Sequence, residues 1–175
     1  NPLYLQIVIM AHCVGHSDFF KNNKEFKNTR PDSAVSRFRN AKKRIQSYIE
    51  DPSIGIDRVE DILDHAHTMR FQIDWYDTKK ESHKELLKKY SKLKRSKKTE
   101  KYKDFDLGKI PLEPDFDILK FIVDYGHHLD EWEKDLISIV REESQYFIPQ
   151  IKTKIMNEGW ASFWHYKLLH ELNIS

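Results

Sequence analysis

Two histidines near the beginning of the chain and a glutamate near its end have the residue types and spacing of a metal site. His12 and His16 lie four residues apart, which places both imidazoles on one face of a helix. Two imidazoles one turn apart can bind a single metal ion, as on the HExxH helix of zinc proteases, and a glutamate from a distant helix is the usual third ligand. Glu158 is the candidate for that ligand, and zinc is the ion that this nitrogen and oxygen set favours.

Glu143 and His165 are the candidates for catalytic roles at such a site. Glu143 occupies a position on a helical stripe where an apolar residue is expected, so its carboxylate is a candidate for proton transfer or for a further ligand. His165 follows Glu158 by two helical turns and is a candidate ligand, a partner that orients a ligand, or an electrophile that steadies an oxyanion. Cys13 stands where HExxH has its catalytic glutamate, so a general base must come from elsewhere.

Each of these residues also has a reading without metal chemistry. The histidines can be hydrogen-bonded core residues, Glu143 an exposed helix residue, and Glu158 the ion-pair partner of a nearby lysine. A second metal hypothesis, a di-metal carboxylate helical protein, uses pairs that have the spacing of two-metal helical bundles. These pairs are Asp64 with His67 and Asp124 with His127.

The elements that must position these residues are helices. Glycine is scarce, with five in the chain, and apolar residues recur at helical spacing, which predicts a mainly α protein, an irregular helical bundle with a zincin-like arrangement of the metal-site helices. The first helix is expected to be buried, with Leu5, Ile9 and Phe19 or Phe20 on the same inward stripe as the two histidines. The further helices are expected at residues 33–50, 57–73, 116–147 and 153–172, with loops at the prolines between them.

The composition fits one helical domain, residues 1–175, read as an interior fragment of a longer protein because no methionine precedes its first apolar run. That run is too short to span a membrane. The lone Cys13 excludes an internal disulfide framework and is typical of a cytoplasmic protein.

A basic segment, residues 78–108, is expected to be solvated and mobile. Residues 79–103 contain twelve Lys and Arg against three Glu, which makes an acidic protein partner a candidate. Nucleic acid is disfavoured, because the only aromatic residues there, Tyr90 and Tyr102, form no interleaved stacking pattern.

Three stretches of the sequence, HCVGHSDFFKNN, VREESQYFIPQ and TKIMNEGWASFWH, resemble the SpoVR family, the stage V sporulation protein R-like proteins. The resemblance implies a cytoplasmic protein linked to spore-cortex formation. The residues that match the family's motifs are His12, His16, Asp18, Lys21, Asn22, Asn23, Asn157, Glu158, Trp160 and His165.

Together, the residues and the resemblance predict a zinc-dependent hydrolase of amide bonds, with a peptide or a peptidoglycan precursor as substrate. In this scheme the metal activates water, Glu143 moves the proton and His165 steadies the oxyanion. The alternative is a non-catalytic interaction scaffold in which the same polar cluster is structural.

Overall fold

The computed structural model describes residues 2–75, 82–94, 106, 112 and 116–172. Within these residues the protein is mainly helical and has no strand, as predicted. The elements are α1 (Leu3–Asn22), the short 3-10 helix η1 (Lys24–Phe26), α2 (Pro31–Glu50), α3 (Gly55–Thr68), α4 (His83–Lys94), α5 (Ile118–Tyr125) and α6 (Glu131–Glu171).

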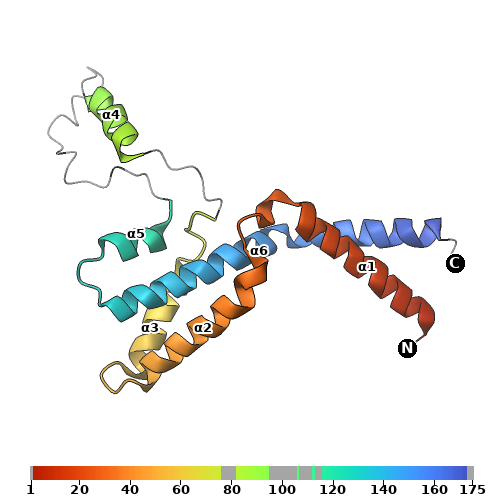
Figure 1. Ribbon diagram of the computed structural model, residues 1–175, viewed down its shortest axis with the longest axis horizontal. Helices are drawn as coiled ribbons and strands as arrows, with labels where there is room; N and C mark the ends of the chain where they lie inside the picture. Colours follow the sequence, from red (N-terminus) through yellow and green to blue (C-terminus); the bar gives the residue numbers. More distant parts are fainter. Residues whose placement is uncertain (1, 76–81, 95–105, 107–111, 113–115, 173–175) are drawn as a thin grey trace.

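The long helix α6 organises the molecule. Figure 1 shows α2, α3 and α5 gathered around its N-terminal half, while α1 crosses its C-terminal half and forms an arm with it. The core lies beside the N-terminal half, where two adjoining apolar clusters share Ile62 and Leu63 of α3. The side chains that this core buries most completely are Val59, Leu119, Leu136, Ile139, Val140 and Ile148.

The predicted boundary between the last two helices is wrong. The helix predicted over residues 116–147 is divided at Gly126, where α5 ends, and α6 begins after Asp130 with a capping box that Glu133 completes. Pro149, which was expected to separate two helices, lies inside α6 and is buried. A proline in a helix interior removes one backbone hydrogen bond, and here packing outweighs that loss.

The predicted inward stripe of α1 is only partly confirmed. Phe19 is buried and His12 and His16 are partly buried, but Leu5 and Ile9, nearer the N-terminus, are exposed. Gly15 is also buried, and the two helices lie close together there, since an added Cβ would lie 2.7 Å from the Cα of Ala161. The two histidines therefore lie at the edge of the α1–α6 contact, partly buried, and not inside a buried helix.

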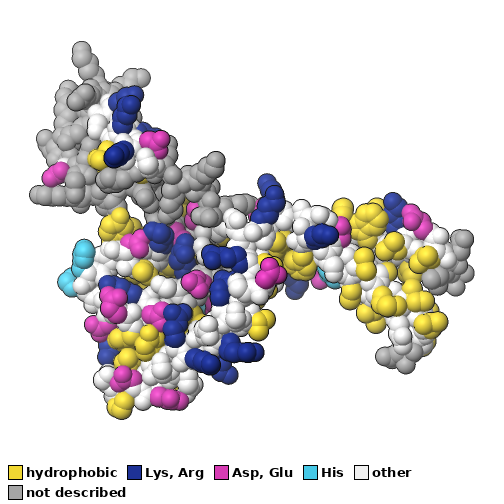
Figure 2. All heavy atoms as spheres, in the orientation of Figure 1, with side chains coloured by type: hydrophobic (Ala, Val, Ile, Leu, Met, Phe, Trp, Pro, Cys, Tyr) yellow, Lys and Arg dark blue, Asp and Glu magenta, His cyan; other side chains and the backbone are white. Residues whose placement is uncertain are grey.

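Large apolar side chains remain exposed on the arm. Figure 2 shows them gathered over α1 and the end of α6. Those at least 55% exposed are Leu3, Tyr4, Ile9, Met10, Val14, Ile155, Met156, Phe163, Tyr166 and Leu172. A patch of this kind is typical of surfaces that pack against other polypeptide. None of the described helices is both long and apolar enough to span a membrane.

The basic segment predicted over residues 78–108 is described only in part. Helix α4 lies in this segment, and its side chains Lys84, Lys88 and Lys92 are exposed. Outside α4 only residues 82 and 106 of the segment are described, so its expected mobility stays a prediction.

Candidate metal centre

The structure brings His12, His16 and Glu158 together, although 142 residues separate the second histidine from the glutamate. They form the one group of three or more potential metal ligands among the described residues. Helix α1 supplies both imidazoles from successive turns, and the C-terminal half of α6 supplies the carboxylate. The di-metal pairs Asp64 with His67 and Asp124 with His127 form no such group in this part of the chain.

The three ligand atoms form a triangle of the right size for a divalent ion. The Nε2 atoms of His12 and His16 are 3.0 Å apart, and each lies 3.7 Å from Oε2 of Glu158. A point equidistant from all three atoms is about 2 Å from each, which is the length of Zn–N and Zn–O bonds. The distances between the three atoms are therefore compatible with one shared ion.

Two outer contacts hold the imidazole rings in position. Nδ1 of His16 lies 2.9 Å from Oδ1 of Asn157, and because this oxygen only accepts hydrogen bonds, His16 donates from Nδ1. Nε2 of His16 then presents a lone pair to the centre of the triangle. Nδ1 of His12 lies 3.2 Å from Nδ1 of His165. Ligating histidines characteristically donate their second ring N–H in this way.

The centre is accessible on one side. The side chain of Glu158 is 56% exposed, whereas those of His12 and His16 are 30% and 24% exposed. A metal at the centre of the triangle would have three protein ligands and a position open to solvent. This is the arrangement of catalytic zinc sites, since structural sites are closed by four protein ligands.

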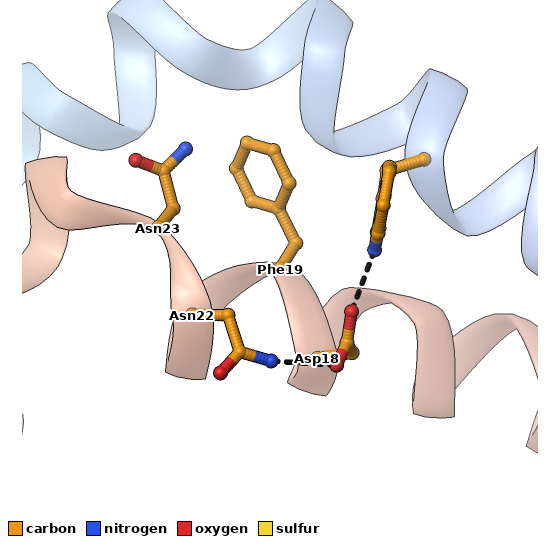
Figure 3. A pocket seen from close by; sticks show the side chains of 5 residues that line it. Asp18, Phe19, Asn22 and Asn23 are labelled. Carbon is orange, nitrogen blue, oxygen red and sulfur yellow. Dashed lines mark hydrogen bonds between the residues drawn. The ribbon is translucent and has the colours of Figure 1, made fainter.

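A pocket of about 240 Å³ lies next to the triangle, lined by residues that follow His16 on α1 and by Trp160, two residues after Glu158 on α6. Figure 3 shows Phe19 between Asn23 and Asp18, with Asn22 bonded to Asp18. Trp160 closes the pocket from α6 by donating from Nε1 to Oδ2 of Asp18 at 2.9 Å. Sequence analysis did not anticipate this cross-helix bond, because no local pattern links residues so distant in the chain.

Glu143 does not join the cluster. It precedes Glu158 by about 22 Å along α6, at 1.5 Å per residue, and lies on the half of the helix that faces α3. Burial raises the pKa of Glu143, while the charge of His67 on α3 opposes that shift. Of the two predicted catalytic residues, therefore, only His165 lies at the metal triangle.

The raised pKa of Glu143 gives a stability test. The folded protein favours the protonated carboxyl, so this stabilisation is complete below the ordinary glutamate pKa, about 4.3, and is lost as the pH rises through the raised value. Glu143→Gln should therefore raise the melting temperature at pH 8 by roughly 2 °C, a small effect because the group is partly solvated, and should not raise it at pH 4. Thermal melts at both pH values measure this difference.

The control is Glu142→Gln, which removes the same charge from the exposed neighbouring position. It should give no pH-dependent gain. An equal gain from both variants would attribute the effect to net charge and not to the burial of Glu143.

The sequence of the whole chain matches a known family. A family model described as SpoVR like protein matches residues 1–175. The chain belongs to the SpoVR-like family. This SpoVR-like chain is also 35% identical over 189 residues to a protein of Escherichia coli (strain K12) whose printed name is Uncharacterized protein YcgB. The alignment covers 98% of the chain and 37% of that relative. No solved structure gives a significant match.

Proposed function

We propose that this SpoVR-like chain carries a divalent-metal centre formed by His12, His16 and Glu158, with zinc as the preferred ion. The observation that supports it most directly is the triangle of ligand atoms. The point equidistant from the three atoms lies about 2 Å from each, which is the length of a bond to zinc. His165 has a positioning role, since its contact with Nδ1 of His12 fixes the ring whose Nε2 faces the ion.

The hydrogen bonds of the two histidines are compatible with a cation between them. Without an ion, His12 can donate from Nε2 to Nε2 of His16, which already donates from Nδ1 to Asn157. With an ion, His12 carries its proton on Nδ1, where His165 accepts it, and both Nε2 lone pairs bind the metal. In both states every imidazole nitrogen in this chain of contacts has a partner. A metal ion can therefore bind without loss of the hydrogen bonds to Asn157 and His165.

We further propose that the loaded centre is zincin-like and hydrolyses an amide or peptide bond. The open metal position would hold a water molecule, whose pKa zinc lowers towards neutrality. The pocket of Asp18, Phe19, Asn22, Asn23 and Trp160 would take one residue-sized group of the substrate. The link to spore-cortex formation that the family resemblance implies would suit a peptide or peptidoglycan-precursor substrate.

Zinc titration tests the proposed centre. The chain should bind about one zinc ion, and His16→Ala should weaken that affinity at least a hundredfold, because one of three ligands is lost. His165→Ala should weaken it about tenfold to a hundredfold, the range found for residues that orient ligands. Zinc should raise the melting temperature of the wild type and not that of His16→Ala.

The matched control is His170→Ala. His170 is an exposed residue of α6, the helix that carries Glu158 and His165, and among the described groups its Nδ1 contacts only the carbonyl of Tyr166. It should bind zinc like the wild type. Equal zinc affinity in His16→Ala and His170→Ala would rule out the proposed ligands. Zinc binding without release of amines from a peptide mixture would instead favour the alternative, a structural centre in an interaction scaffold.

A further inference from the structure

A second pocket, on the other half of α6, has a strongly cationic lining. Its volume is about 270 Å³. It is lined by the loop between η1 and α2, by Trp75 in the segment that follows α3, and by α6. The lining residues are Lys27, Asn28, Arg30, Trp75, Arg141 and Gln145. Three of these side chains are cations and none is acidic. Such a concentration of positive charge at a concave surface attracts anions.

The positive charge of the pocket is only partly neutralised within the described residues. Arg141 is paired with Asp117, whose side chain is 1% exposed and accepts from Nη2 at 2.7 Å and from Nε at 2.8 Å. Lys27 and Arg30 are exposed and form no ion pair with any described residue. Two positive charges therefore remain beside the arginine that Asp117 holds in place.

The backbone at Arg30 points to a role for this side chain. Arg30 has φ 47° and ψ 60°, the left-handed conformation, and is the one non-glycine residue with positive φ in the described part of the chain. The turn is held by its carbonyl groups, since Arg37 donates to the oxygens of Thr29 and Arg30 at 2.9 and 3.3 Å. Glycine would adopt this conformation with less strain, so the turn itself does not require an arginine.

We infer that this pocket binds a small anion through a phosphate or carboxylate group, with Lys27 and Arg30 as the residues that supply the binding charge. An arginine fork suits either group, because both present paired oxygens. The volume is below that of pockets for drug-sized ligands and matches one small anionic group. Gln145 precedes Glu158 by about 20 Å along α6, so the site is separate from the metal centre.

Calorimetric titration of the metal-free chain with inorganic phosphate, and separately with acetate, tests this site at constant ionic strength. Wild-type protein should bind at least one of the two anions more tightly than chloride, and the responding anion identifies the group recognised. Lys27→Gln combined with Arg30→Gln should weaken that binding about tenfold or more. Arg39→Gln combined with Lys43→Gln removes the same charges from exposed positions of α2 and should leave the affinity unchanged.

Arg30→Gly keeps the test decisive if the double variant folds poorly. Glycine suits the observed φ, so this variant should melt at or above the wild-type temperature and still bind the anion at least threefold more weakly. The site would be refuted by wild-type binding no tighter than for chloride. Equal affinity in the wild type and the Lys27/Arg30 variant, or equal loss in the α2 control, would also refute it. Because no metal is present, none of these results depends on the zinc proposal.

Discussion

Replacing Gly15 by alanine is expected to lower both the stability of the chain and its affinity for zinc, although alanine is the better helix former. In an exposed helix the change would stabilise by about 1 kcal/mol. At Gly15 the new Cβ would lie 2.7 Å from the Cα and 3.3 Å from the carbonyl oxygen of Ala161. Those are backbone atoms of α6, so neither can move aside as a flexible side chain would, and the two helices must separate.

The separation acts directly on the proposed metal centre. His16 follows Gly15 on α1, and Glu158 precedes Ala161 by less than one turn on α6. When the helices move apart, the distances of 3.7 Å from both Nε2 atoms to Oε2 of Glu158 increase. Overpacking of this kind costs about 1–3 kcal/mol. We expect a similar loss in zinc binding, about tenfold or more, measured by zinc titration alongside urea denaturation.

Gly159→Ala is the matched control for this prediction. Gly159 belongs to the same arm and adjoins Glu158, but an added Cβ there meets no atom within 4 Å. The control should be as stable as the wild type or more stable, by up to about 1 kcal/mol, with unchanged zinc affinity. If Gly15→Ala matched Gly159→Ala in both measurements, the close helix crossing would not be what holds the ligands together.

The sequence predicts the helical class and the candidate ligands because both depend on local spacing. Two histidines one turn apart remain on one face whatever the helix packs against, so His12 and His16 are found without knowledge of the partner helix. Glu158 is a candidate because it matches a motif of the family that the sequence resembles. In the structure the three ligand atoms lie within 4.8 Å of one another, and metal binding by them stays a prediction.

How far α1 is buried, and where the helices end, could not be predicted, because tertiary packing decides both. Periodicity places Leu5, Ile9 and Phe19 on one stripe, but of these three only Phe19 is buried, and Leu5 and Ile9 are exposed. Pro149 resembles a helix boundary in sequence, yet packing keeps it within α6. Sequence alone does not show which glycine lies at a helix contact: Gly15 packs closely against α6, whereas Gly159 faces open space.

Interactions between distant polar residues were missed for the same reason. Asp117 caps α5 and Arg141 lies in α6. The residues that flank each of them in the sequence give no sign that their side chains form an ion pair. Glu143 shows the opposite error. Glu143 is partly buried, as its position on an apolar stripe indicates, but it lies near His67 of α3 and not beside the metal triangle.

Asp117→Ala is expected to be the most destabilising single substitution proposed for this chain. Asp117 is 1% exposed and joins three elements. It caps α5 by accepting from the backbone N–H of Lys120 at 2.9 Å, accepts from the N–H of Asp74 at 3.3 Å, and pairs with Arg141 of α6. Removing one partner of a buried ion pair costs about 3–5 kcal/mol, and loss of the cap adds about 1 kcal/mol. Urea denaturation measures the loss.

Two comparisons separate the causes of this loss. Asp117→Asn keeps an oxygen that can cap α5 but removes the charge, so its effect should fall between those of the wild type and Asp117→Ala. Asp124→Ala removes an acidic side chain from the same helix, where it forms only a surface ion pair with Lys120, and should cost less than about 1 kcal/mol. A loss below 1 kcal/mol for Asp117→Ala would show that Arg141 finds another partner or water. Zinc affinity should be unchanged in every folded variant, because Asp117 lies beside the N-terminal half of α6 and the metal ligands lie on the arm.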